Sequence, residues 1–142
     1  MRGMDPLRRK LAGAGRLSDN LRGALTAEGL LLLEEGLAGS ITYRNYRAPG
    51  SRSSLRKEAT SGAIAVTTQR LVIWAGGGKS IDIPLHHPFR AALKVSIEQP
   101  GRICFSYDAG RFRPDRSGTV EVRLRTPQAT RVADLLRATG SF

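Results

Sequence analysis

The sequence predicts a mainly β domain that is closed by a C-terminal α-helix. From Leu30 onward apolar and polar residues alternate, which is the pattern of half-buried strands, and glycine, proline and asparagine separate the alternating segments. After Thr126 the apolar period changes to that of an amphipathic helix. The chain of 142 residues is 40% apolar, which suffices for one core without disulfide bonds. We therefore expect one domain over residues 28–142, preceded by an arm of residues 1–27.

The N-terminal arm is predicted to be helical or partly flexible. Leu7, Leu11 and Ala14 recur at helical spacing. Ser18 followed by Asp19 is typical of the start of a second short helix. Each glycine inside such a helix lowers its stability by about 1 kcal/mol relative to alanine, and the arm is rich in glycine. We expect an appendage and not a second domain.

Eight short antiparallel strands are predicted between the arm and the closing helix. Gly36–Gly39 is expected to turn the chain between the first two strands, and Ala48–Ser61 has the composition of an exposed loop. Only two residues separate the third strand from the fourth, which predicts a tight hairpin. The expected strands are Leu30–Leu37, Ser40–Arg47, Gly62–Thr67, Arg70–Ala75, Lys79–Leu85, Ala92–Glu98, a strand through Ile103, Phe105 and Tyr107, and a strand through Val120, Val122 and Leu124.

The closing helix is predicted from its cap and its apolar stripe. Thr126 is a capping residue, and Pro127 fits the first helical position, where its missing N–H is harmless. The helix is expected to end before Gly140 and to pack its stripe on the strands. The stripe consists of Ala129, Val132, Leu135 and Leu136.

A local motif suggests a fold family. A strand, a threonine, an Arg-Leu pair and a second strand follow one another over Gly62–Trp74, and an Ile-Pro-Leu strand follows over Lys79–Leu85. This order resembles the signature of bacterial pleckstrin-homology-like and GRAM-like domains, over roughly residues 28 to 139. The resemblance implies a pleckstrin-homology-like barrel of two packed antiparallel sheets with a C-terminal helix. It implies uses that range from phosphoinositide or membrane binding to protein interaction and oligomer formation, so it predicts the fold and not the ligand.

The charge balance is strongly basic. Lysine and arginine number 23 against 12 aspartate and glutamate residues, which gives a formal net charge of +11, and most of the cations are arginine. A field of this sign attracts nucleic acid, anionic lipid head groups or an acidic protein face. A basic surface without a dedicated ligand explains the composition equally well.

The apolar runs are too short for a membrane-spanning helix. Leu30–Leu33, for example, is followed at once by Glu34, whereas a span needs about 20 apolar residues. The basic N-terminus is not followed by the apolar region of an export signal. The single cysteine, Cys104, cannot form an internal disulfide, which agrees with a reducing compartment. We expect a cytoplasmic protein that is free to associate with a membrane surface.

The first candidate site is a run of five cations on the second predicted strand and the loop after it, with no carboxylate before Glu58. In lipid-binding pleckstrin-homology domains the cations of the pocket lie on the first strands and their loops. The predicted first turn, Gly36–Gly39, is uncharged, which argues against specific inositol phosphate binding. An anion- or partner-binding site and a solvated basic face both stay open. The five cations are Arg44, Arg47, Arg52, Arg56 and Lys57.

A secondary basic patch is predicted at Arg111, Arg113 and Arg116. Phe112 is the aromatic residue interleaved with these cations, whereas single-strand binding usually needs several stacking aromatics on a basic groove. The chain has four Phe, three Tyr and one Trp, most of them at core positions of the strand pattern. Nucleic acid is therefore the alternative ligand class.

No arrangement of residues predicts catalysis, a metal or a cofactor. His86 and His87 are adjacent, so they point to opposite sides of a strand, and no second pair of metal ligands has a suitable spacing. Gly76–Ser80 resembles the end of a phosphate-binding loop, but it lacks the first glycine and opens a strand instead of a helix. No histidine is placed as a base for Cys104.

The sequence thus predicts a non-catalytic binding or adaptor domain. We expect it to contact an acidic protein face or an anionic membrane surface through the arginine-rich run, with nucleic acid association as the alternative. The N-terminal arm is expected to serve in docking or self-association.

Overall fold

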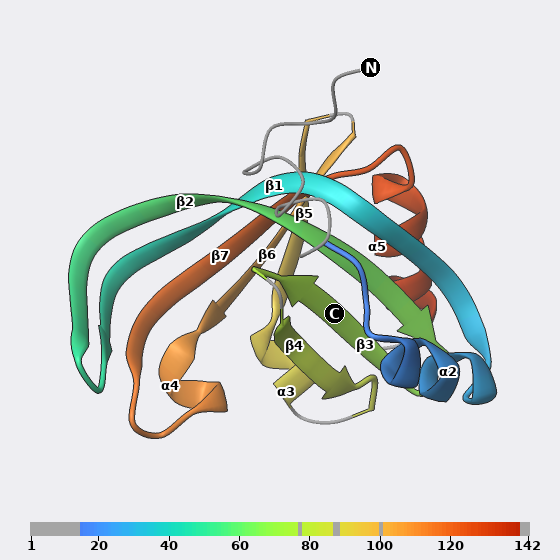
Figure 1. The fold of residues 1–142 in the computed structure, drawn as a ribbon, viewed down its shortest axis with the longest axis horizontal. Coiled ribbons are helices and arrows are strands. Elements are labelled where there is room, and N and C mark those ends of the chain that lie inside the picture. Colours follow the sequence, from blue (N-terminus) through green and yellow to red (C-terminus); the bar gives the residue numbers. More distant parts are fainter. Residues whose placement is uncertain (1–14, 77, 87–88, 100, 140–142) are drawn as a thin grey trace, which may run out of the picture.

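The computed structural model describes residues 15–76, 78–86, 89–99 and 101–139, which form seven strands and four helices (Figure 1). The first predicted helical stretch of the arm lies outside these residues. The strands are β1 (Leu30–Ala48), β2 (Ser51–Thr67), β3 (Arg70–Ala75), β4 (Gly78–Pro84), β5 (Lys94–Gln99), β6 (Arg102–Asp108) and β7 (Ser117–Arg125). The helices are α2 (Asp19–Ala27), α3 (Phe89–Ala92), α4 (Ala109–Phe112) and α5 (Ala129–Thr139).

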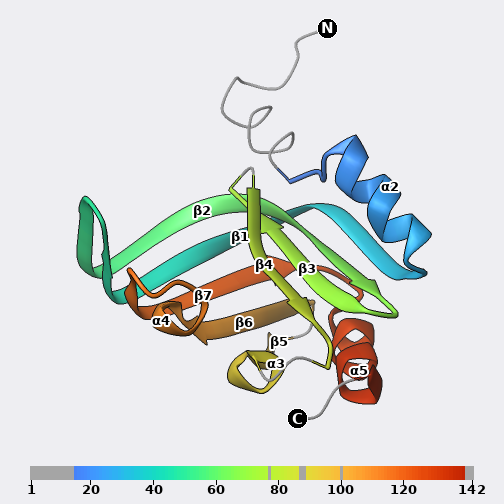
Figure 2. The same ribbon diagram turned by 90° about the horizontal axis from the view of Figure 1, so that it is seen from below.

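The strands form one curled antiparallel sheet in the order β4-β3-β2-β1-β7-β6-β5. The prediction of a mainly β fold with a C-terminal helix is confirmed, but the prediction of two packed sheets is wrong. The reason is the length of β1, which has 19 residues. It pairs with β2 from Leu30 to Ala48 and with β7 from Gly39 to Arg47, so it joins both halves of the sheet. The result is a half-barrel with a concave inner face (Figure 2).

The first predicted hairpin is also wrong. Gly36 has a φ of 69° and lies in a register shift between Glu34 and Leu37, so the chain absorbs this glycine in a bulge and continues as one strand, in which Gly39 pairs with Thr60. The segment Ala48–Ser61, predicted as an exposed loop, instead contributes most of β2, because its polar residues pair with β1. The true first turn lies at Gly50, whose φ is 74°. The eight predicted strands therefore become seven.

The main core fills the concave side of the sheet. Phe105, Ile64 and Leu71 are fully buried there. The predicted stripe of α5 is confirmed, since its Ala129, Val132 and Leu136 are buried in the same cluster and Leu135 packs against it. Helix α5 begins after a turn in which the Thr126 hydroxyl accepts a hydrogen bond from the Gln128 amide at 3.0 Å. Helix α5 lies at one end of the half-barrel (Figure 1).

Helix α2 packs on the outer face of the sheet, opposite the core (Figure 2). Ser18 caps it as predicted, because its hydroxyl accepts a hydrogen bond from the Leu21 amide at 3.2 Å. Leu25 is buried against small side chains of β2. Glu35 of β1 accepts a hydrogen bond from the Leu17 amide at 2.9 Å. This part of the arm is therefore held by both packing and hydrogen bonds.

Two glycines allow the central strands to approach closely. A Cβ atom at Gly39 would overlap the carbonyl oxygen of Arg123 on β7. A Cβ atom at Gly62 would overlap the carbonyl oxygen of Trp74 on β3. These neighbours are backbone atoms within paired strands, which cannot rotate away as a side chain does. The curl of the sheet at its centre therefore depends on glycine at both positions.

The close approach is testable with a pair of glycine substitutions. Gly39→Ala is expected to lower the free energy of unfolding by about 1–3 kcal/mol, because the added methyl group must displace the strand backbone. Gly23→Ala in α2 is the matched control. Nothing lies within 4 Å of its Cβ position, so it should raise the free energy of unfolding by about 0.5–1 kcal/mol. Urea unfolding measures both, and effects of the same sign would contradict this account of the sheet.

Candidate functional site

The predicted basic run lies on the hairpin formed by β1 and β2, which we call the basic hairpin. Arg47 pairs with Arg52 across the two strands, so the two cations flank the turn at the tip. The hairpin stands at the end of the molecule opposite α2 and α5 (Figure 1). From Arg44 to Lys57 the sequence contains no carboxylate. The uncharged turn predicted at Gly36–Gly39, which argued against inositol phosphate binding, does not exist. The first turn lies between Arg47 and Arg52.

The structure does not gather the five cations on one face. Arg56 lies over the ring of Tyr43, with its guanidinium carbon 4.4 Å from the ring centroid. Arg44 lies on the other face, where its Nε donates to Glu121 Oε1 at 3.0 Å. Arg47, Arg52 and Lys57 are exposed and form no ion pair within the described part of the chain. These three are the cations of the basic hairpin that stay open to a partner.

Arg44 belongs to an ion-pair network on the outer face of β1, β7, β6 and β5. Glu121 also accepts from Arg123 Nη1 at 3.1 Å, and Arg123 Nε donates to Glu98 Oε1 at 2.8 Å. Arg102 lies 3.3 Å from the same carboxylate. The hydrogen bond from Arg123 is the main cause that lowers the pKa of Glu98, and the bond to Glu98 raises the pKa of Arg123. The network fixes Arg44 as a structural residue.

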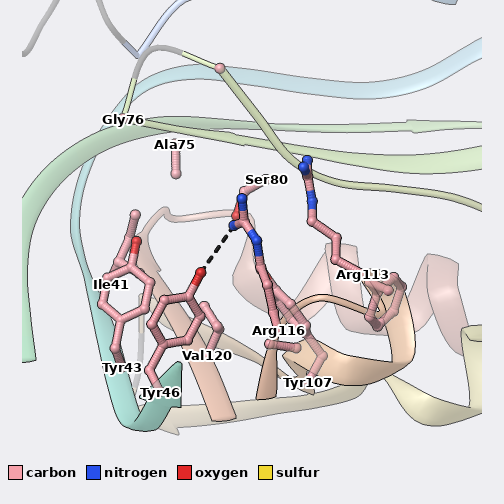
Figure 3. A pocket seen from close by; sticks show the side chains of 13 residues that line it. Ile41, Tyr43, Tyr46, Ala75, Gly76, Ser80, Tyr107, Arg113, Arg116 and Val120 are labelled. Carbon is pink, nitrogen blue, oxygen red and sulfur yellow. Dashed lines mark hydrogen bonds between the residues drawn. The ribbon is translucent and has the colours of Figure 1, made fainter. Parts of the chain in front are cut away.

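The secondary basic patch lies beside a cavity on the concave side of the sheet. Arg113 and Arg116 line this cavity, which has a volume of about 310 Å³, whereas Arg111 faces a separate hollow. Helix α4 positions them, because Asp108 caps it by accepting from the Gly110 amide at 2.8 Å. The structure therefore brings two of the three predicted patch residues together. Figure 3 shows both guanidinium groups reaching toward the segment that carries Ser80.

The same cavity collects the tyrosines, whose role sequence reasoning missed. All three tyrosines of the chain, Tyr43, Tyr46 and Tyr107, line it together with Phe112. Tyr43 and Tyr46 meet edge to face with centroids 4.9 Å apart, and Tyr107 meets Phe112 in the same way at 5.0 Å. We call this space, with Arg113 and Arg116, the tyrosine–arginine cavity.

A bulge in β1 brings two of these tyrosines to one side. Residues three apart in a regular strand point to opposite faces, so Tyr43 and Tyr46 would be separated. Asn45 adopts a left-handed conformation with a φ of 49°, and the register with β7 shifts between Arg44 and Arg47. Gly118, with a φ of 98°, faces this bulge, and a Cβ atom there would overlap the Asn45 carbonyl oxygen. The bulge turns Tyr46 toward the cavity (Figure 3).

The polar groups of the cavity include two guanidinium groups, which only donate hydrogen bonds, and hydroxyl groups, which both donate and accept. Arg116 Nη1 donates to the Tyr46 hydroxyl at 3.0 Å. Its Nε is buried and has no hydrogen-bond partner among the described residues, and Asp115 Oδ1 is 3.8 Å away, beyond hydrogen-bond distance. Burial raises the pKa of Tyr43 and of Tyr107, so both phenols carry their protons at neutral pH.

Other residues singled out in the sequence do not join this cavity as reactive groups. Cys104 is buried on β6, and burial raises the pKa of its thiol to about 11, so the thiolate is scarce at neutral pH. His86 is exposed, and His87 lies outside the described residues. Within residues 15–76, 78–86, 89–99 and 101–139, no three histidine, cysteine or acidic side chains cluster as metal ligands.

No model of a known protein family matches the sequence, and no protein with a curated description does so. Among the described residues, no helix has the length and apolar character needed to span a membrane. The function is therefore inferred from the geometry of the basic hairpin and the tyrosine–arginine cavity.

The ion-pair network makes stability depend on pH in a defined direction. The pKa of Glu98 is lower in the folded protein than its ordinary value of 4.5, so folding favours the charged carboxylate. This stabilisation is complete above pH 4.5 and is lost as the pH falls through the lowered folded-state pKa. Glu98→Gln is expected to lower the free energy of unfolding at pH 7 by about 1 kcal/mol, because the site is partly exposed.

The difference between the parent protein and Glu98→Gln should shrink as the pH is lowered below 4.5. Urea unfolding at a series of pH values measures it. Glu58→Gln is the control, since Glu58 is exposed and forms no ion pair in the described part of the chain. A difference that stays constant down to low pH would show that the network does not contribute in this way.

Proposed function

We propose that this protein is a non-catalytic binding domain that contacts an anionic membrane surface through the basic hairpin. The observation that carries this proposal is the exposed group of Arg47, Arg52 and Lys57 beside an exposed apolar side chain. Leu55 is 62% exposed and pairs with Arg44 across the strands. Cations flanking an exposed leucine on a projecting hairpin suit a surface that is both negatively charged and apolar just below its head groups.

The expected binding is weak and reversible. Each cation near an anionic bilayer contributes about 1 kcal/mol, and full burial of a leucine side chain contributes about 1.5–3 kcal/mol. Three open cations and Leu55 therefore supply enough for peripheral association but not for permanent anchoring. The electrostatic part is screened by salt, with a Debye length of about 8 Å at physiological ionic strength. Such a protein would move between the cytoplasm and the membrane surface.

Membership in the pleckstrin-homology-like family is part of the same proposal. It rests on the motif over Gly62–Trp74 and Lys79–Leu85, which corresponds to β2, β3 and β4. The corrected position of the first turn, between Arg47 and Arg52, agrees with cations on the first hairpin. An acidic protein face is the other partner class for the same three cations. No observation specifically favours nucleic acid, because the tyrosines that stacking would need line the cavity and not the basic hairpin.

Vesicle co-sedimentation tests the membrane contact. The protein is expected to sediment with phosphatidylcholine vesicles that contain phosphatidylserine, and not with pure phosphatidylcholine vesicles. Replacing Arg47, Arg52 and Lys57 together with serine should weaken this binding roughly a hundredfold at low salt. Leu55→Ser should weaken it at all salt concentrations, because the apolar part of the interaction is not screened.

The matched control removes three exposed arginines at the other end of the molecule, Arg125, Arg131 and Arg137, which lie on or near α5. This control variant has the same change of net charge as the hairpin variant. Because its basic hairpin is intact, it should bind vesicles better than the hairpin variant does. Equal losses in the two triple variants would show that net charge alone drives binding. If the parent protein does not sediment with anionic vesicles, the membrane proposal is wrong, and an acidic protein partner becomes the next candidate.

A further inference from the structure

The tyrosine–arginine cavity has the size and surface of a small ligand site. Its volume of about 310 Å³ is roughly twice that of an apolar cavity that accepts benzene, and it falls at the small end of the range for ligand pockets. The rings of Tyr43, Tyr46 and Tyr107 supply flat apolar walls, to which Ile41 and Val120 add aliphatic surface. The space therefore fits one aromatic ring with a short side arm.

The charges in the cavity specify the sign of the ligand. Two guanidinium groups line it, and no carboxylate does, within the part of the chain that the structure describes. Arg116 Nε is buried without a hydrogen-bond partner there, which costs free energy unless an acceptor is bound. Arg113 forms no side-chain hydrogen bond or ion pair with the described residues, so its donors are available. An oxyanion satisfies both groups.

The arrangement is held in place before any ligand arrives. The hydroxyl of Tyr46 accepts from Arg116 Nη1, and the bulge at Asn45 keeps Tyr46 turned inward. On the other wall, the backbone amide of Arg113 donates to the Ala109 carbonyl at 2.9 Å, and that of Arg116 donates to the Arg113 carbonyl at 3.1 Å. These bonds fix the segment that carries both guanidinium groups. Little conformational order has to be gained on binding.

We propose that the tyrosine–arginine cavity binds a small organic acid, with a flat apolar body among the tyrosine rings and its oxyanion on Arg116 and Arg113. Arg116 is the primary partner, because its side chain is already oriented by Tyr46, and Arg113 closes on the anion from the exposed side. The proposal is independent of the membrane contact, since Arg47, Arg52, Lys57 and Leu55 do not line the cavity.

Phenylacetate is the probe for this site, and phenylacetamide is its neutral counterpart of the same shape. Titration calorimetry and amide NMR shifts measure affinity and location. We expect phenylacetate to bind at least about tenfold more tightly than phenylacetamide, because only the acid forms charge-assisted hydrogen bonds. The largest shifts should fall on Tyr43, Tyr46, Tyr107 and Phe112. Phenyl phosphate, compared in the same way, shows whether the oxyanion is a carboxylate or a phosphate.

Three substitutions test the assigned roles. Arg116→Gln is expected to weaken phenylacetate binding about tenfold and to leave phenylacetamide binding unchanged. Tyr46→Phe removes only the hydroxyl that orients Arg116, so it should cause a smaller loss. Arg113→Gln changes an exposed side chain without a described partner, so it keeps the test valid even if Arg116→Gln fails to fold. Arg125→Gln is the control of equal charge, on the exposed end of β7.

Equal affinity for the acid and the amide would overturn the proposal, as would no binding of either acid. It would also be overturned if Arg125→Gln weakened phenylacetate binding as much as Arg113→Gln and Arg116→Gln. The membrane contact and the ligand site can be disproved separately. The triple serine variant of the basic hairpin should still bind phenylacetate, and Arg116→Gln should still sediment with anionic vesicles.

Discussion

The continuity of β1 is the constraint on which the rest of the structure depends. This strand pairs with β2 on one side and with β7 on the other, so it belongs to both halves of the half-barrel. Where β1 pairs with β7, a Cβ atom at position 39 would overlap the carbonyl oxygen of Arg123, and glycine at this position permits the approach. If β1 ended at Gly36, the sheet would divide into two. The basic hairpin and one wall of the cavity would then have no support.

Two of the irregularities of β1 have separate roles. The bulge at Gly36 places its backbone amide beside the N-terminal segment, where the amide donates a hydrogen bond to the Gly15 carbonyl at 3.0 Å. The neighbouring Glu35 accepts a hydrogen bond from Arg22 at 2.8 Å. At Asn45 the bulge turns Tyr46 inward. The first therefore fastens α2 to the outer face, and the second shapes the inner one. A strand of perfect alternation would have supported neither arrangement.

How far the sequence predicts this fold depends on where the stabilisation of each segment comes from. The stripe of α5 and the alternation of β3, β6 and β7 are local patterns that bury one face, so they could be predicted. The polar first half of β2 buries little surface of its own and is a strand because β1 pairs with it, for example at Thr42 and Lys57. The cations of the candidate sites could be named, but their grouping could not. It follows from the bulge at Asn45 and from the cap of α4.

The positive charges of the chain differ in how far nearby carboxylates neutralise them. Arg44, Arg70 and Arg123 are each bound to a carboxylate on another strand, so their charges stabilise the sheet and offer little to a partner. The cations without such partners in the described residues include Arg47, Arg52 and Arg113, at the hairpin tip and the cavity. The β1–β2 turn and α4, which Arg113 follows directly, lie on the side of the half-barrel away from α5 (Figure 1). Under both proposals, an approaching anion meets these open cations at the end where the hairpin projects.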